Sequence, residues 1–211
     1  GNGGLNKAFL GFGYQLNDNF SFGFDSKYNF GNIQNTALEF LYDDESEPLD
    51  YQAREVNRSD LSGVNFNFGI IYKGNLKNNL ELHGSLSFSP EYNLSSRNSR
   101  VFASVVINPN TDLEYPVNEI EVDLESVGLE KTDLTMPSRT NFGLGLGKSK
   151  KWFVGAEYTF LSSSVFSNDL INIENSQFED SSVISIGGFF IPDYASFGKF
   201  WSRVVYRGGF Y

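Results

Sequence analysis

Three residue types that can act together in catalysis lie near the middle of the chain. Glu81, His83 and Ser85 place a carboxylate, an imidazole and a hydroxyl at alternate positions, which puts all three on one face of a β-strand. A nucleophile and its base need heavy atoms about 2.6–3.2 Å apart, but same-face neighbours on one strand start about 7 Å apart. No oxyanion-hole signature accompanies them, so we expect a structural histidine and no enzymatic activity.

Two arginines further along the sequence are candidates for binding an anionic group. Arg203 and Arg207 are four residues apart, and each could hold a carboxylate through paired hydrogen bonds. On a single strand they would lie on the same face about 13 Å apart. One carboxylate could not reach both without a third group, so the pair alone is a poor ligand site.

The composition argues against metal and nucleic-acid sites. The 211 residues contain no Cys and one His, which removes thiolate and multi-histidine metal sites. Acidic stretches at 43–47 and 112–133 do not have the spacing of a calcium loop. A net charge of −10 argues against general affinity for nucleic acid. We therefore expect no cofactor, no metal and no nucleic-acid partner.

The elements that position these side chains show a repeat of two residues. From 20 to 31, apolar residues alternate with polar residues and glycine, which is typical of a strand with one apolar and one polar face. The same pattern predicts eight strands, at 7–16, 20–31, 64–73, 80–89, 141–147, 152–160, 183–191 and 199–211.

Short and long connections alternate between these strands. The long ones, at about 32–62, 90–136 and 161–180, hold 21 acidic and 5 basic residues, whereas the rest of the chain holds 5 acidic and 11 basic residues. We expect the long connections to be solvated extracellular loops that could cap a pore or contact a partner subunit. Alternating segments within them, such as 36–42 and 101–107, could form extra strands that extend hairpins beyond the membrane.

The strand lengths and connections favour a membrane protein over a soluble β-sandwich, which also has alternating strands. The predicted strands have about 10–13 residues, where soluble strands have about 5–6 and membrane strands need about 9–11. Short turns at one end and long loops at the other are typical of outer-membrane barrels. The prediction is an all-β, antiparallel, up-and-down transmembrane β-barrel in the bacterial outer membrane. Residues 1–211 would form one barrel domain, or a fragment of one, in contact with lipid.

In such a barrel the polar face would line the lumen. Its charged residues carry both signs, so they could pair with one another or orient the carboxylate of a ligand. The predicted lumen-facing residues are Asp25, Lys27, Glu81, His83, Glu157, Arg203 and Arg207.

Two segments resemble the long-chain fatty-acid transporter (FadL-type) outer-membrane family. They are 1–14, with Phe20-Ser21-Phe22-Gly23 after it, and 136–145, which runs into 152–158 with its Trp152. The resemblance implies a fourteen-strand barrel with an N-terminal hatch that carries an Asn-Pro-Ala motif. This sequence has eight predicted strands and no such motif, so we expect part of a larger barrel. A complete eight-stranded barrel is the alternative.

The resemblance also implies a function, namely uptake of small hydrophobic molecules of the fatty-acid or aromatic-hydrocarbon type without chemistry. The main alternative is a structural or accessory barrel subunit that docks partner proteins through its acidic extracellular loops. A lipid-modifying enzyme is a third interpretation, and it would depend on His83.

Overall fold

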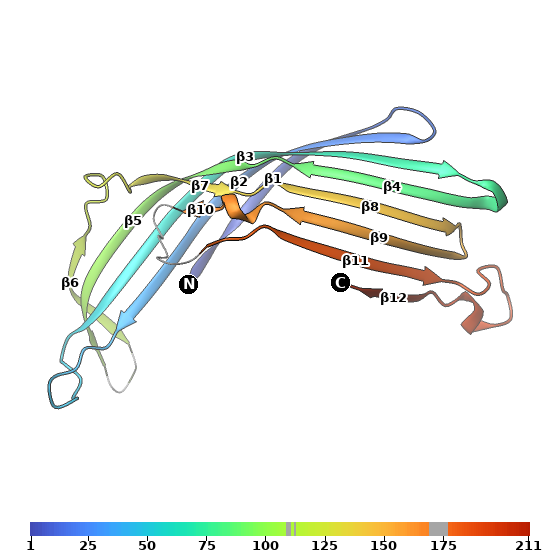
Figure 1. The fold of residues 1–211 in the computed structure, drawn as a ribbon. Helices are drawn as coiled ribbons and strands as arrows, with labels where there is room; N and C mark the ends of the chain where they lie inside the picture. The colour runs from blue at the N-terminus through green and yellow to red at the C-terminus, as the bar shows by residue number, and fades with distance from the viewer. Residues whose placement is uncertain (109–110, 112, 169–176) are drawn as a thin grey trace.

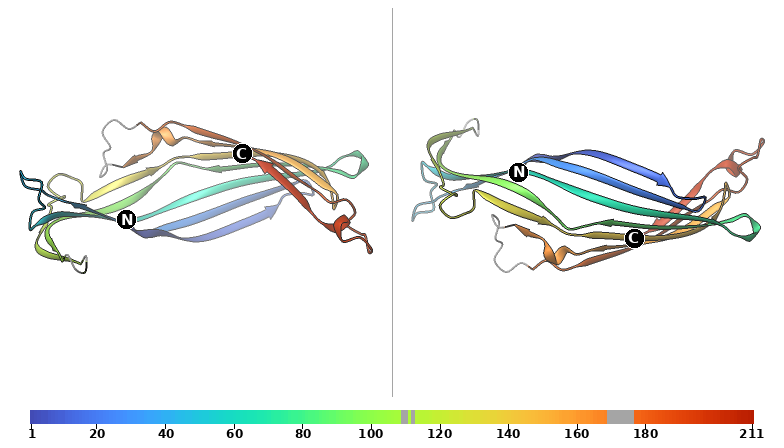
Figure 2. Two further views of the ribbon diagram at one scale, coloured as in Figure 1. Left: turned by 90° about the horizontal axis from the view of Figure 1, so that it is seen from below. Right: turned by 90° about the horizontal axis from the view of Figure 1, so that it is seen from above.

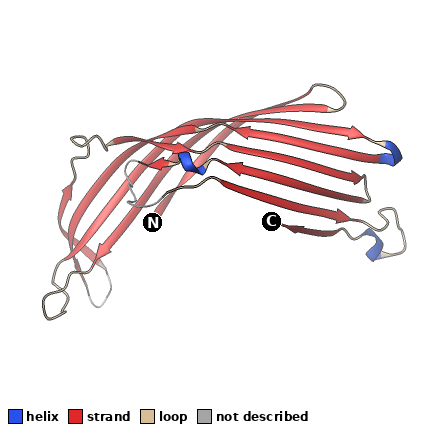
Figure 3. Ribbon diagram, viewed as in Figure 1, coloured by secondary structure: helices blue, strands red, loops and turns tan. Residues whose placement is uncertain are grey.

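The computed structural model describes residues 1–108, 111, 113–168 and 177–211. Within them the chain forms one antiparallel sheet of twelve strands with three short 3-10 helices (Figure 3). The strands are Asn2–Gln15 (β1), Phe20–Glu39 (β2), Gln52–Asn75 (β3), Leu80–Ser89 (β4), Tyr92–Ile107 (β5), Glu114–Glu121 (β6), Lys131–Met136 (β7), Arg139–Lys148 (β8), Trp152–Leu161 (β9), Ser167–Asn168 (β10), Ser181–Phe190 (β11) and Tyr206–Phe210 (β12). The helices are Lys77–Asn79 (η1), Ser163–Val165 (η2) and Phe200–Arg203 (η3). No described helix has the length and apolar character needed to cross a membrane.

The strands follow one another as a meander with a side branch. Neighbouring strands run in the order β1-β2-β3-β4-β8-β9-β11-β12, and β5 pairs with the part of β3 that β4 does not reach. Strands β6 and β7 pair with the far edge of β5, and β10 pairs with β7. In Figure 1 the short turns lie at one end of the sheet, and β5, β6 and β7 extend toward the other.

The all-β antiparallel prediction is confirmed, but the sequence pattern undercounts the strands. The eight predicted strands correspond to β1, β2, β3, β4, β8, β9, β11 and β12, while β5, β6, β7 and β10 lie in segments expected to be connections. The segment 32–62 is also largely strand, because β2 continues to Glu39 and β3 begins at Gln52. Both faces of this hairpin carry polar residues, so apolar alternation marks only part of it. The extra strand expected at 36–42 is confirmed as far as Glu39, and the one expected at 101–107 is the end of β5.

The last predicted strand, 199–211, is mostly not a strand. Only Tyr206–Phe210 pairs with β11, while Phe200–Arg203 forms η3. The backbone N–H of Ser202 donates to Lys199 O, and that of Asp193 donates to Ser202 O. These turn bonds fold the segment before β12 and take Arg203 off the strand.

A β-bulge joins β4 to β5. Phe68 pairs with Phe88, whereas Ser62 pairs with Ser95, so six steps along β3 correspond to seven along its partner. The extra residue falls at the break around Pro90, which has no N–H to donate to the sheet. The bulge reverses which positions face each side, so that even-numbered residues of β5 share a face with odd-numbered residues of β4.

The sheet is strongly curved and twisted (Figures 1 and 2). We call the side that bears Asp25, Lys27 and Asn29 the inner face, and the side that bears Phe24 and Phe68 the outer face. In the described residues β1 pairs only with β2 and β12 only with β11, so the sheet is open. The structure thus establishes a curved antiparallel wall and does not show a closed barrel.

Candidate interaction surface

The outer face carries a continuous apolar band. On β3, every outward residue from Val64 to Tyr72 is aliphatic or aromatic, which is nine residues of strand. Aromatic rings meet across strands, with centroids 4.9 Å apart for Phe20 and Tyr72 and 5.3 Å apart for Phe24 and Phe68. Most band side chains are exposed, including Phe66 and Ile70 of β3. The band continues onto other strands through Tyr28, Leu86, Phe142, Leu144, Val154, Tyr158 and Ile186.

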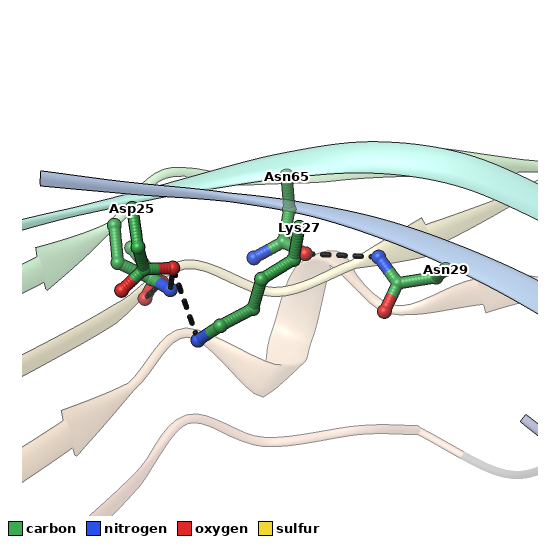
Figure 4. Close-up of polar contacts among 6 residues, drawn as sticks. Asp25, Lys27, Asn29 and Asn65 are labelled. Carbon is green, nitrogen blue, oxygen red and sulfur yellow. Dashed lines mark hydrogen bonds and ion pairs between the residues drawn. The ribbon is translucent and has the colours of Figure 1, made fainter. Parts of the chain in front are cut away.

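On the inner face a chain of polar contacts begins at β2. Lys27 Nζ lies 3.2 Å from Asp25 Oδ1, and both side chains are about one-third exposed. Asn67 Nδ2 donates to Asp25 Oδ1 at 2.6 Å, and the Ser89 hydroxyl donates to Asn67 Oδ1. Figure 4 shows the Asp25–Lys27 pair beside Asn29 and Asn65. Two predicted lumen-facing residues, Asp25 and Lys27, are thus brought together as an ion pair.

Next to this pair lies an amide contact that water does not reach. The Asn29 side chain is fully buried and donates to Asn65 Oδ1 at 2.9 Å (Figure 4). Leu61 and Leu94 are also buried on the inner face, close to Gly63. A Cβ at Gly63 would overlap the Leu94 side chain and the Asn93 carbonyl, so the glycine is what lets β5 approach β3 here.

A second set of inner-face contacts spans β4, β8 and β9. Asn141 Nδ2 donates to Ser87 Oγ at 2.9 Å, and Asn141 Oδ1 accepts from Thr159 Oγ1 at 2.9 Å and Arg139 Nε at 3.2 Å. Thr159 Oγ1 also lies 3.3 Å from Glu157 Oε1. The predicted residue Glu157 therefore ends a polar network that also includes the Arg139 guanidinium, and no ion pair of the described residues involves Glu157.

Glu81 and His83 are the second predicted pair that the structure brings together. His83 Nε2 lies 3.4 Å from Glu81 Oε2, which is also 3.2 Å from Lys73 Nζ. The imidazole packs edge-on against the Phe153 ring, with centroids 5.6 Å apart. No described hydrogen bond joins His83 to Ser85, whose hydroxyl lies over Gly143 instead. This arrangement orients a histidine but does not present an activated nucleophile.

The two predicted arginines do not form one site. Arg203 ends η3, whereas Arg207 lies on β12 opposite Phe189. The expectation that they share one strand face is wrong, because the helical turn at Phe200–Arg203 breaks the strand.

A row of glycines crosses four strands of the inner face at one height. Gly145 pairs with Gly155, Gly155 with Gly187, and Gly187 with Gly209. The Phe153 ring lies across the β8 end of the row, where a Cβ at Gly145 would overlap it. Toward β12 the row forms the floor of a hollow of about 520 Å³.

Beyond the apolar band lies the distal half, which comprises β5, β6, β7, β10, residues 32–39 of β2 and residues 52–62 of β3. Asn98 is its best-connected buried side chain. Its Oδ1 accepts from Ser59 Oγ at 2.8 Å and Ser96 Oγ at 2.7 Å, and its Nδ2 donates to Leu129 O and Thr132 Oγ1 at 2.9 Å each. This one amide ties β3, β5, β7 and the segment before β7 together.

Ion pairs cover the outer face of the distal half. Arg54 Nη2 lies 2.9 Å from Glu119 Oε1 and Arg54 Nη1 lies 3.5 Å from Glu114 Oε2. Arg54 and Glu119 pair in register with Ala103 from opposite sides, so the arginine side chain crosses over this small residue. Ala103 and Val105 are accordingly buried, at 6% and 0% exposure.

In the connection between β9 and β11, Asp180 accepts hydrogen bonds from Ser164. The Ser164 hydroxyl donates to Asp180 Oδ1 at 2.6 Å and the Ser164 backbone N–H donates at 3.0 Å. These bonds favour the charged carboxylate and lower the pKa of Asp180 below its ordinary value. Of the other acidic residues of this connection, Glu179 is described, whereas Asp169 and Glu174 lie outside the described residues.

Within the described residues, no cluster of three or more His, Cys, Asp or Glu side chains could hold a metal ion. The described structure is thus a wall with an apolar outer band, an inner face on which many polar groups bond one another, and an acidic distal extension. These features offer surfaces for binding.

The fold places the protein in the class of all-β proteins built on one antiparallel sheet. Comparison with family models identifies the family within that class. The family model described as BamG matches residues 1–211, so the chain belongs to the BamG family. No curated protein matches the chain. Family membership associates the protein with the outer membrane of Gram-negative bacteria and is compatible with protein partners.

The family assignment overturns the resemblance to FadL-type transporters. Residues 136–145 lead into β8, and residues 152–158 lie in β9. Alternation of glycine and aromatic residues suits a curved antiparallel sheet in general, so it does not identify one family. The expected uptake of small hydrophobic molecules is therefore wrong, because it rested on that resemblance. The accessory alternative agrees better with the family.

Several residues of these surfaces were not singled out from the sequence. Alternation assigns Asn141 and Thr159 to the polar face, but it does not reveal their mutual hydrogen bond. Asn98 is also hidden, because the bulge at Pro90 reverses the faces before it. The glycine row has a visible signal, since Gly145, Gly155 and Gly187 occupy alternating polar-face positions, but only the register shows that they are level.

Proposed function

We propose that this protein is an accessory outer-membrane β-barrel subunit that serves outer-membrane protein assembly by docking partner proteins, without chemistry of its own. Membership of the BamG family supports the assembly role. The observation that carries the accessory interpretation is the inner face, where Asp25 with Lys27, Asn29 with Asn65, and Asn141 with Ser87 and Thr159 bond one another. Polar groups already engaged in this way brace a wall, whereas a transport path needs them free for a ligand.

The outer band supports placing this wall in lipid. Nine residues of β3 between Val64 and Tyr72 match the roughly 9–11 residues that a tilted strand needs to cross the membrane. Lipid offers no hydrogen bonds to an unpaired edge, so the edges at β1 and β12 must be paired there. We infer a closed barrel in the membrane, in which further strands complete the wall.

The charge distribution supports an orientation. The short-turn end carries Lys73, Lys77, Lys148, Lys150 and Lys199, whereas the segments 32–62, 90–136 and 161–180 carry a net charge of −16. Outer-membrane barrels have short periplasmic turns and longer extracellular segments. The distal half would therefore face the outside of the cell, with its acidic surface available to partners.

The test is affinity purification of the tagged protein from native membranes in a mild detergent. We expect components of the outer-membrane assembly machinery in a fixed ratio to the tagged protein, and reduced levels of other outer-membrane proteins when the protein is depleted. A tagged barrel of similar abundance from an unrelated family is the control. Recovery of the protein without these components, together with unchanged outer-membrane protein levels on depletion, would refute the proposal.

A further inference from the structure

An apolar patch lies on the inner face of the distal half, away from the apolar band. We call it the distal patch and define it as Phe102 and Val106 of β5 with Tyr115 and Ile120 of β6. Phe102 pairs in register with Ile120, and Val106 with Tyr115, so each pair lies side by side on one face. All four side chains are exposed, from 36% for Val106 to 61% for Ile120.

The hairpin does not use these side chains for its own packing. On β5 the outward residues Ala103 and Val105 are buried, while the inward residues Phe102 and Val106 are exposed. Arg54, reaching Glu119 across Ala103, closes the outer face. Nothing described covers the inner face at this point. On this face the two apolar pairs flank one polar pair, Ser104 with Asn118. Exposed apolar side chains with a polar surround are typical of an interaction site.

The charges around the patch identify the kind of surface that would fit it. The segments 32–62 and 90–136 hold 17 acidic and 5 basic residues. Four of those basic residues already pair with carboxylates of the same chain, namely Arg54, Arg58, Arg97 and Arg100. The surplus is therefore negative. On the patch face, Glu55 beside Phe102 is paired with Arg100, whereas Glu39, in register with Ser104 through Ala53, has no ion pair among the described residues. Such a surround attracts lysine and arginine and repels anionic lipid headgroups.

We propose that the distal patch is the docking site for a partner protein whose contact surface has an aliphatic or aromatic centre flanked by lysine or arginine. This inference rests on the proposed function and names the surface that would serve it. Burial of the apolar side chains at the centre supplies the affinity, and Tyr115 belongs to a residue type enriched among the residues that dominate interface energies. The acidic surround supplies orientation and the rate of encounter.

The direct test places a photo-cross-linking amino acid, p-benzoylphenylalanine, at Phe102 in the full chain in living cells. The expected product is a cross-link to a co-purifying partner, in a peptide that contains lysine or arginine next to apolar residues. The same probe at Thr36, which is exposed in the distal half on the outer face, should not give this product. Cross-links from Phe102 only to lipid or to a second copy of this chain, or none at all, would overturn the proposal.

A second measurement uses the paired substitution Phe102→Asp with Ile120→Asp. Recovery of the cross-linked partner should fall by about tenfold or more, as expected for loss of central contacts. Asn35→Asp, which adds a negative charge on the same face away from the patch, should leave recovery unchanged. Folding of each variant is checked by its gel mobility with and without heating. Unchanged recovery with the folded double variant overturns the patch alone, whereas absence of assembly components from the unaltered protein overturns the proposed function.

Discussion

Strand β3 passes through two regions in which the same backbone meets opposite surroundings. From Val64 to Tyr72 its outward side chains are apolar and mostly exposed, and its inward residues Asn65 and Asn67 are polar and hydrogen-bonded. From Gln52 to Ser62 the outer face is covered by ion pairs, and the neighbouring β5 instead exposes Phe102 on the inner face. The register with β2 is unbroken across both regions.

The comparison shows that backbone pairing does not depend on the side-chain pattern in this sheet. The backbone hydrogen bonds of β3 continue through both regions, while the distribution of apolar and polar side chains between the two faces changes. The change fits a strand that leaves lipid and enters water, because an apolar outward face is favourable in contact with lipid and unfavourable in water. Each substitution below tests one side of this contrast.

The largest effect is expected for an arginine placed on the apolar band. Phe66→Arg should lower the free energy of unfolding by about 2–4 kcal/mol, the cost measured for arginine on the lipid face near the bilayer centre. Thr36→Arg, on the outer face of the distal half, should change it by less than about 0.5 kcal/mol. Urea unfolding in lipid vesicles measures both. Equal costs would remove the contrast between the two regions.

A smaller effect is expected for the buried amide of the distal half. Asn98→Ala should cost about 1–3 kcal/mol, because it leaves the Leu129 carbonyl and the hydroxyls of Ser59, Ser96 and Thr132 without their partner. Asn141→Ala should cost about 1 kcal/mol or less, since its half-buried partners can bond to water. The same unfolding assay compares the two variants. A larger cost for Asn141→Ala would show that the half of the sheet that carries the apolar band, which we call the near half, depends more on its polar contacts than the distal half does.

The ion pairs on the outer face of the distal half should contribute little to the free energy of unfolding. Arg54→Met keeps the side chain's packing over Ala103 and removes its bonds to Glu114 and Glu119, at a cost of up to about 1 kcal/mol. Arg58→Met removes the more exposed pair with Asp60 and should have no measurable effect. A cost for Arg54→Met well above this would make the cover a principal support of the distal half.

The smallest effect is a pH dependence at Asp180. Because the folded-state pKa of this carboxyl is lowered by Ser164, its hydrogen bonds stabilise the fold above the ordinary aspartate pKa and are lost as the pH falls through the lowered value. Ser164→Ala should return the pKa of Asp180 to its ordinary range, as measured by NMR titration. An unchanged pKa in that variant would contradict the assignment of the shift to Ser164.

The sequence predicts the near half well, because its strands have one apolar face and one polar face. Wherever one face of a strand is apolar and the other polar, as on Phe20–Phe30, alternation locates the strand and sorts its faces. The ion pair of Asp25 with Lys27 and the contact of Glu81 with His83 follow from that sorting, because residues two apart on one strand share a face.

The distal half escapes prediction for equally physical reasons. Both faces of the β2–β3 extension carry polar residues, so alternation indicates an extra strand only at 36–42 and leaves the rest of the extension unmarked. The position of Asn98 depends on the bulge near Pro90, and its partners Leu129 and Thr132 are supplied by a separate segment. The prediction placed Arg203 on a strand, but backbone hydrogen bonds of a turn form η3 at that point instead. Alternation of apolar and polar residues does not reveal such bonds.

The glycine row has a mechanical consequence for the wall. Where Gly145, Gly155, Gly187 and Gly209 lie level, four neighbouring strands lack a side chain on the inner face at the same height. The Phe153 ring occupies this space at Gly145 and Gly155. The strands can therefore bend toward the inner face most easily at Gly187 and Gly209, as glycine kinks allow in other curved sheets.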